Sequence, residues 1–142
     1  MRPETEKAKQ LLAKDNRTLV LCSKNETITS GGRGVKTLLS LAEDSRDLAD
    51  FCAADKAVGK GAAALFVLLG VKEIYAEIMS EKAKQLLSDN SIDVYAALTV
   101  PAILNRKKDG FCPIETAVDD IDDPKEALSA IKEALKKMTA FK

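Results

Sequence analysis

Two short stretches of the chain bring together side chains that could carry chemistry. The first, residues 51–70 (FCAADKAVGKGAAALFVLLG), begins with Asp55, Lys56 and Lys60 and then runs almost wholly apolar. An apolar run of this length is too short to cross a bilayer and is typical of a buried helix. We therefore predict a central buried helix whose charged start faces a cleft.

Each polar residue at this predicted helix start has two interpretations. Asp55 is either the N-cap of the helix or a partly buried carboxylate that acts as a base or accepts a hydrogen bond from a ligand. Lys56 and Lys60 lie four residues apart on one helical face, which suits an anion but equally suits two solvated lysines. Gly59 and Gly61 each cost about 1 kcal/mol against alanine inside a helix. Close packing of a neighbouring strand, or else a ligand, would explain them.

The second stretch is the run Cys112-Pro-Ile-Glu115. A cysteine just before a helix can have its thiolate stabilised by the field of the helix N-terminus, and Glu115 could exchange a proton one turn further on. The chain contains no histidine, which excludes Ser-His-Asp and Cys-His catalysis and leaves a thiolate without its usual basic partner. We therefore expect Cys112 and Glu115 to line a pocket. An enzyme that uses Asp55, Cys112 and Glu115 is the alternative.

A glycine-rich turn is a third candidate site. Residues 30–34 (SGGRG) lead into a predicted helix, where free N–H groups, Arg33 and Lys36 could hold a phosphate or carboxylate. The simpler interpretation is a strand-to-helix turn that needs glycine at positive φ. A group of four aspartates could bind a hard cation, but a helix cap and a solvated turn explain it, so we expect no metal and no other cofactor. These aspartates are Asp119, Asp120, Asp122 and Asp123.

The elements that position these residues follow from the spacing of apolar and turn-forming residues. We predict helices over residues 3–14, 35–42, 51–70, 80–88, 113–118 and 124–138, and strands over 18–23, 27–30, 71–78 and 92–98. This order predicts an α/β protein, specifically a three-layer α/β/α sandwich with a mixed sheet of four or five strands that starts with an antiparallel hairpin. Ligands in such sheets bind beyond the carboxyl ends of the parallel strands.

Composition limits the class of protein. A chain of 142 residues is expected to form a single domain over residues 1–142, and its net charge of 0 gives no signal for binding nucleic acid or an anionic membrane. Its first residues lack the apolar region of a signal peptide, so we expect a cytoplasmic protein. Three cysteines without CxxC spacing argue against a disulfide framework.

Five stretches carry a resemblance to a known family: RGVKTLL, FCAADKAVGKGAA, GVKEIYAEIMSE, VPAILNR and CPIETAV. They are spread over residues 33–118. In these stretches the chain resembles a small, uncharacterised bacterial family, a domain of unknown function with a cytidine-deaminase-like fold. The resemblance implies a cleft lined by two helix starts, and deaminase-like folds commonly associate, so a homodimer is compatible with it.

The zinc motifs of true deaminases are absent from the expected places. Zinc deaminases carry H/C-x-E at the start of the buried helix and P-C-x-x-C at the start of the next. Here the first place reads Cys52-Ala-Ala-Asp55 and the second reads Met79-Ser-Glu-Lys-Ala83, so we expect no zinc-dependent deamination. The leading hypothesis is a metal-free protein that binds a small anionic or nucleotide-like ligand. A regulatory or interaction domain without a reaction is the other alternative. The predicted ligand-binding residues are Arg33, Lys36, Lys56, Lys60 and Asn105.

Overall fold

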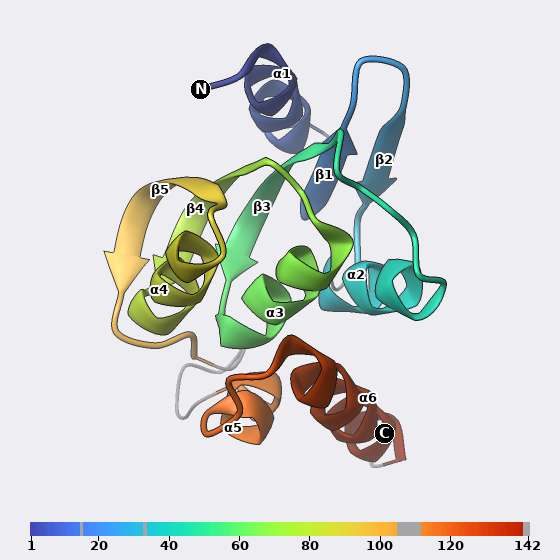
Figure 1. Cartoon of the computed structure of the whole chain (residues 1–142), viewed down its shortest axis with the longest axis vertical. Coiled ribbons are helices and arrows are strands. Elements are labelled where there is room, and N and C mark those ends of the chain that lie inside the picture. Colours follow the sequence, from blue (N-terminus) through green and yellow to red (C-terminus); the bar gives the residue numbers. More distant parts are fainter. Residues whose placement is uncertain (15, 33, 105–111, 141–142) are drawn as a thin grey trace.

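The computed structural model of the chain describes residues 1–142 except residues 15, 33, 105–111 and 141–142. The described residues form five strands: β1 Leu19–Cys22, β2 Thr27–Ser30, β3 Cys52–Val58, β4 Glu73–Ser80 and β5 Asp93–Val100. They also form six helices: α1 Pro3–Leu12, α2 Gly34–Glu43, α3 Lys60–Leu69, α4 Glu81–Asp89, α5 Pro113–Val118 and α6 Pro124–Ala140. Figure 1 shows these elements as one α/β arrangement.

The five strands form one open, mixed sheet in the order β2-β1-β3-β4-β5. The hairpin β1–β2 is antiparallel, and β1 also pairs antiparallel with β3. Strands β3, β4 and β5 are parallel, with α3 and α4 as the connections between them. The predicted α/β class and the mixed sheet that starts with an antiparallel hairpin are therefore confirmed.

Helices cover both faces of this sheet, but unequally. On one face, Ala8 and Leu12 of α1 pack on Val20, Cys22 and Ala54 from β1 and β3. The other face carries the main core, to which α2, α3, α4 and α6 contribute apolar side chains. Figure 1 shows α1 on one side of the sheet and α3 and α4 on the other. Helix α3 is buried on almost all sides, with Phe66 and Leu65 fully enclosed.

The predicted central helix over residues 51–70 is wrong in its first half. Cys52–Val58 is strand β3, in the middle of the sheet, and the helix begins only at Lys60, with Gly59 as its N-cap. A strand buried on both faces reads as a continuous apolar run, and a short run of this kind has the same pattern as a buried helix. The interpretation of Asp55 as a helix N-cap is therefore wrong, and so is a shared helical face for Lys56 and Lys60.

The predicted helix ends are confirmed at several places. Gly70 closes α3 in the left-handed conformation at φ 77°, which glycine adopts without steric cost. Ser80 caps α4 by accepting a hydrogen bond from the Ala83 N–H, and Pro113 occupies the first turn of α5. Within the part of the chain that the structure describes, no helix is long and apolar enough to span a membrane.

Candidate functional site

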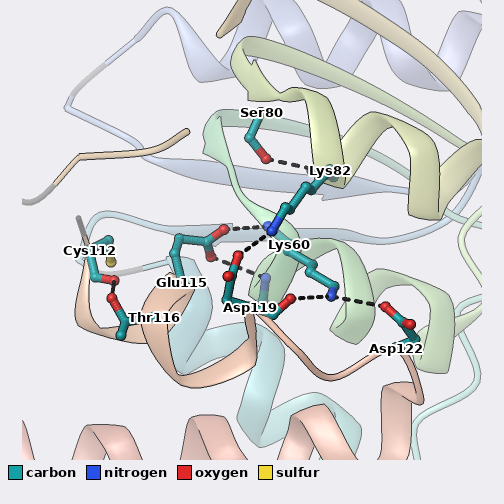
Figure 2. A network of polar contacts seen from close by, with 10 residues as sticks. Lys60, Ser80, Lys82, Cys112, Glu115, Thr116, Asp119 and Asp122 are labelled. Carbon is teal, nitrogen blue, oxygen red and sulfur yellow. Dashed lines mark hydrogen bonds and ion pairs between the residues drawn. The ribbon is translucent and has the colours of Figure 1, made fainter. Parts of the chain in front are cut away.

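The start of α3 is capped by a carboxylate from a distant part of the chain. Glu115 of α5 accepts hydrogen bonds from the backbone N–H of Lys60 at 2.6 Å and of Gly61 at 3.1 Å. Figure 2 shows its carboxylate directed at this helix start. The first N–H groups of a helix have no partner within the helix, and the helix dipole favours negative charge there. Glu115 therefore occupies the position in which the sequence predicts an anionic ligand.

The space that Glu115 occupies explains the two glycines at the start of α3. A Cβ atom on Gly59 would lie 2.2 Å from Glu115 Cδ, and one on Gly61 would lie 2.8 Å from Cγ2 of Ile114. Real Cβ contacts do not reach such distances, so both positions need a residue without a side chain. Of the two reasons that the sequence leaves open, close packing is the one seen here, and the packed element is α5.

Lys60 connects the residues after α5 to the same helix start through a hydrogen bond and an ion pair. Its side chain is 9% exposed, and its Nζ donates to the Asp119 carbonyl at 2.9 Å and pairs with Asp122 at 3.0 Å. Burial raises the pKa of the Glu115 carboxyl above its ordinary value, while the N–H groups of Gly61 and Lys60 and the charge of Lys60 oppose this rise. The charge of Lys60 is thus satisfied by the chain itself.

A cavity of about 460 Å³ opens beside this cap, at the carboxyl ends of β4 and β5. Its wall is apolar where the chain leaves β5, at Pro101, Ala102 and Ile103, and its polar groups come from the starts of α4 and α5 and the turn after α5. These polar residues are Ser80, Lys82, Glu115, Thr116, Asp119 and Asp120. The position agrees with the rule that ligands of open α/β sheets bind beyond the carboxyl ends of the strands.

The described residues of the cavity lining carry more negative than positive charge. Three carboxylates face it from Glu115, Asp119 and Asp120, and Lys82 is the one cation among the described lining residues. Lys82 forms a close ion pair with Asp119, and this hydrogen bond lowers the pKa of the Asp119 carboxyl. Among the described lining residues, hydrogen-bond acceptors therefore outnumber free donors.

Asp55 lies elsewhere, within β3. It is 5% exposed, its Oδ1 accepts a hydrogen bond from the Ala57 N–H at 3.3 Å, and it faces the start of α2, where a Cβ on Gly34 would lie 3.8 Å away. Burial raises the pKa of this carboxyl to about 7, and the charge of Glu77 adds to the rise. Asp55 does not line this cavity, and its predicted role as a base remains a prediction.

The other predicted site residues do not converge on the cavity. Lys36 on α2 and Lys56 on β3 are exposed, and neither lines it. Cys112 is half-buried just before α5, and its carbonyl accepts a hydrogen bond from the Thr116 hydroxyl (Figure 2). Arg33 and Asn105 lie outside the described residues. Glu115 is thus the single predicted catalytic residue that the described structure places in the cavity lining.

The glycine-rich turn before α2 has a simple structural role. Thr18 holds it by donating hydrogen bonds to the carbonyls of Ser30 and Gly32, at 3.1 and 2.6 Å. Neither Gly31 nor Gly32 has positive φ, so the expected left-handed turn is not the reason for these glycines. The described residues of this turn, 30–32 and 34, are not among those that line the cavity.

Sequence reasoning missed most of the cavity residues. The sequence predicts Ser80 only as the first residue of a helix, and residues 101–103 have no polar side chain that would mark a site. The signal available was topological: Ser80 and Pro101 stand at the ends of two predicted parallel strands, where a ligand site is expected. Among the described residues, no group of three or more acidic or cysteine side chains is placed to hold a metal ion.

Comparisons with known proteins place the chain beside one family. The family model TM1506, described as "Domain of unknown function (DUF1893)", matches residues 7–135. The crystal structure of a DUF1893 family protein (TM1506) from Thermotoga maritima is similar, with a TM-score of 0.82 and 25% sequence identity over 96% of this chain and 92% of that one. No curated protein matches.

Proposed function

The chain belongs to the DUF1893 family, and we propose that it binds a small nucleoside-like molecule in the cavity at the carboxyl ends of β4 and β5. The observation that carries the proposal is the cavity itself. Its volume of about 460 Å³ lies within the range of pockets that enclose small ligands. It combines one apolar wall with a few polar groups on rigid helix starts, which is the usual composition of a small-molecule site.

The charges of the cavity support a ligand that donates hydrogen bonds. Glu115, Asp119 and Asp120 offer carboxylate oxygens, which accept hydrogen bonds from amino and hydroxyl groups. A nucleoside carries such groups on both its base and its sugar, and its flat base suits the apolar wall at residues 101–103. Among the described lining residues a phosphate would meet more carboxylates than cations, so we place the uncharged nucleoside ahead of the nucleotide expected from the sequence.

We also propose that the arrangement is cytidine-deaminase-like, without the zinc site. The order of a hairpin, α2, β3, α3, β4, α4 and β5 supports this proposal. The helix starts that would carry zinc motifs read Gly59-Lys-Gly61 at α3 and Ser80-Glu-Lys82 at α4, with neither cysteine nor histidine. Metal analysis of the purified protein should therefore find much less than one zinc per chain, and a value near one would contradict this part of the proposal.

Binding is favoured over catalysis by a thiol. Cys112 is not among the residues that line the cavity, so a substrate in the cavity would not meet the thiol. Glu115 does line it, and both of its carboxylate oxygens accept hydrogen bonds from α3. Glu115 therefore acts first as a helix cap, and we propose a binding protein whose ligand the carboxylates orient.

A thermal-shift comparison of nucleosides with their 5′-monophosphates tests the proposal. A ligand at a hundred times its dissociation constant stabilises the folded state by about 2.7 kcal/mol, which raises the melting temperature by several degrees. We expect a shift with at least one nucleoside and a smaller one with its monophosphate. A larger shift with the monophosphate would reverse the charge argument, and no shift with any nucleoside would contradict the proposal.

Two variants locate the binding site. Ala102→Trp should fill the cavity and abolish the nucleoside shift, because Ala102 forms part of the apolar wall. Asp120→Asn should reduce the shift, while Asp44→Asn, which removes an exposed carboxylate just after the end of α2, should leave it unchanged. A shift that survives in Ala102→Trp would place the ligand elsewhere.

A further inference from the structure

The sheet face opposite the main core is left partly uncovered. Helix α1 packs on β1 and β3 and reaches only the near side of β4, where Lys9 lies over the Tyr75 ring at 4.7 Å. On β4 and β5 three large apolar side chains are exposed: Tyr95 by 44%, Leu98 by 55% and Ile78 by 38%. Tyr95 is the register neighbour of Tyr75, and Leu98 that of Ile78, so the exposed residues adjoin on β4 and β5.

The outer edge of β5 adds unpaired backbone to this apolar patch. In the described structure β5 pairs with β4 on one side and with no strand on the other. Its residues 94–100 (VYAALTV) contain no charge and no proline. Soluble proteins usually protect a strand edge of this length with a lysine, a proline, a bulge or a covering element, because an unprotected edge pairs with other chains.

We propose that a second copy of this chain covers this edge, with the two β5 strands pairing antiparallel across a two-fold axis and their apolar side chains adjoining across it. The pairing makes one continuous ten-stranded sheet from two five-stranded ones. An isologous contact of this kind closes on itself and leaves no further edge at β5, whereas pairing of β5 with β2 of another copy would continue into a fibre.

The charges on the chain favour a second copy as the occupant. The net charge is 0, so two copies do not repel each other at long range. An uncharged edge also requires an uncharged partner strand, because a charged side chain would lose its water without gaining a counter-ion, and β5 itself meets that requirement.

Helix α4, which lies beside β5, carries exposed charges of both signs: Glu81 at its start, Lys84 in its middle and Asp89 at its end. The two-fold axis sets two α4 helices side by side in opposite directions. This brings Lys84 of each copy toward acidic residues of the other, so the charges beside the uncharged strand edges are complementary.

Sedimentation velocity over a wide range of protein concentration tests the proposal. The wild-type chain should sediment as a dimer. Leu98→Lys places a charge in the patch at a position that is already exposed in the monomer, so the chain should still fold, which its circular dichroism spectrum would verify. The dissociation constant of the dimer should rise by at least about a hundredfold, since both paired edge strands then carry an added like charge.

A matched variant separates the two edges of the sheet. Thr29→Lys adds the same charge to an exposed position of β2, at the opposite edge, and should leave the dimer intact. A monomeric wild type would overturn the proposal, and so would a dimer that survives Leu98→Lys or dissociates with Thr29→Lys. Species larger than a dimer that grow with protein concentration would also overturn the proposal, and would instead indicate open-ended pairing of β5 with β2 of another copy.

Discussion

Asp55, which is buried, and Glu115, which is half-buried, are two carboxylic acids that receive different support from the chain around them. Asp55 lies in the central strand and accepts a 3.3 Å hydrogen bond from Ala57, two residues further along the same strand. Glu115 accepts bonds of 2.6 and 3.1 Å from a helix start that lies more than fifty residues away in sequence. The charge of another acid, Glu77, raises the pKa of Asp55, whereas the charge of Lys60 lowers that of Glu115.

This difference shows how burial and local partners together determine the pKa of a carboxyl group. Burial raises the pKa of both groups, because it disfavours the charged form. Around Glu115, the helix N–H groups and a cation work against that rise and make the charged form useful as a cap. Around Asp55, a neighbouring acid adds to it, and the group titrates near neutral pH. Glu115 therefore supports a helix start, whereas the protonation state of Asp55 in the sheet changes near neutral pH.

The largest expected effect is the pH dependence of stability caused by Asp55. Its pKa is 3.8 as an ordinary group and about 7 in the folded chain. Between these values the folded state holds a proton that the unfolded state has lost, so the free energy of unfolding falls as the pH rises, by roughly 4 kcal/mol in total. Asp55→Asn should remove this slope. Denaturant unfolding from acid to mildly basic pH measures it, and an equal slope in wild type and variant would contradict the contrast between the two acids.

The next effect comes from adding a methyl group under Glu115. Gly59→Ala would place Cβ within 2.5 Å of both carboxylate oxygens, so Glu115 must leave its position and the cap is lost. We expect a loss of about 3 kcal/mol in the free energy of unfolding. Gly32→Ala, with nothing within 4 Å of the new atom, is the control and should have little effect.

A double variant shows whether the clash with Glu115 is the cause. When Glu115→Ala is added to Gly59→Ala, the combined loss should be smaller than the sum of the two single losses, because the methyl group then has room. Strictly additive losses would mean that Gly59 is required for another reason.

A smaller loss is expected when Glu115 keeps its shape but not its charge. Glu115→Gln leaves one oxygen to accept a hydrogen bond and turns an amide N–H₂ toward the second helix N–H, which then lacks a partner. An unsatisfied buried donor costs about 2 kcal/mol. Glu126→Gln, in the first turn of α6, changes an exposed carboxylate and serves as the control. A loss no larger than that of the control would show that the charge of Glu115 does not support α3.

The smallest effect concerns the neighbouring helix, which is capped locally. The Ser80 hydroxyl accepts a hydrogen bond from the Ala83 N–H at 3.2 Å. Ser80→Ala should lower the free energy of unfolding by about 1 kcal/mol, and Ser80→Thr should restore most of it. If Ser80→Ala lowered the free energy of unfolding more than Glu115→Gln does, the local cap of α4 would contribute more to stability than the distant cap of α3.

The sequence was sufficient for most of the fold because most elements have an unambiguous pattern. Helix α6 has Pro124 at its first position, and Gly70 marks the end of α3. Strand β3 was missed for a physical reason. Its residues Cys52-Ala-Ala face apolar neighbours on both sides of the sheet, so the strand shows no alternation, and its alanines have the highest helix propensity of any residue.

The candidate site was less predictable, because it depends on contacts between distant segments. The glycines at the start of α3 showed that something comes close to the backbone, and Glu115 was singled out separately, but no local pattern connects the two. The cavity needs the ends of β4 and β5 together with α5. Only the general position of sites in parallel sheets pointed to it in advance.

The distant cap also makes the first turn of α3 a reporter on another part of the chain. The amide protons of Lys60 and Gly61 are shielded from exchange with solvent by an acceptor that belongs to α5. When α5 detaches, these two protons become free to exchange, while those deeper in α3 stay bound to the helix itself. Their hydrogen-exchange rates would therefore measure a partial unfolding of the C-terminal helices, separately from global unfolding.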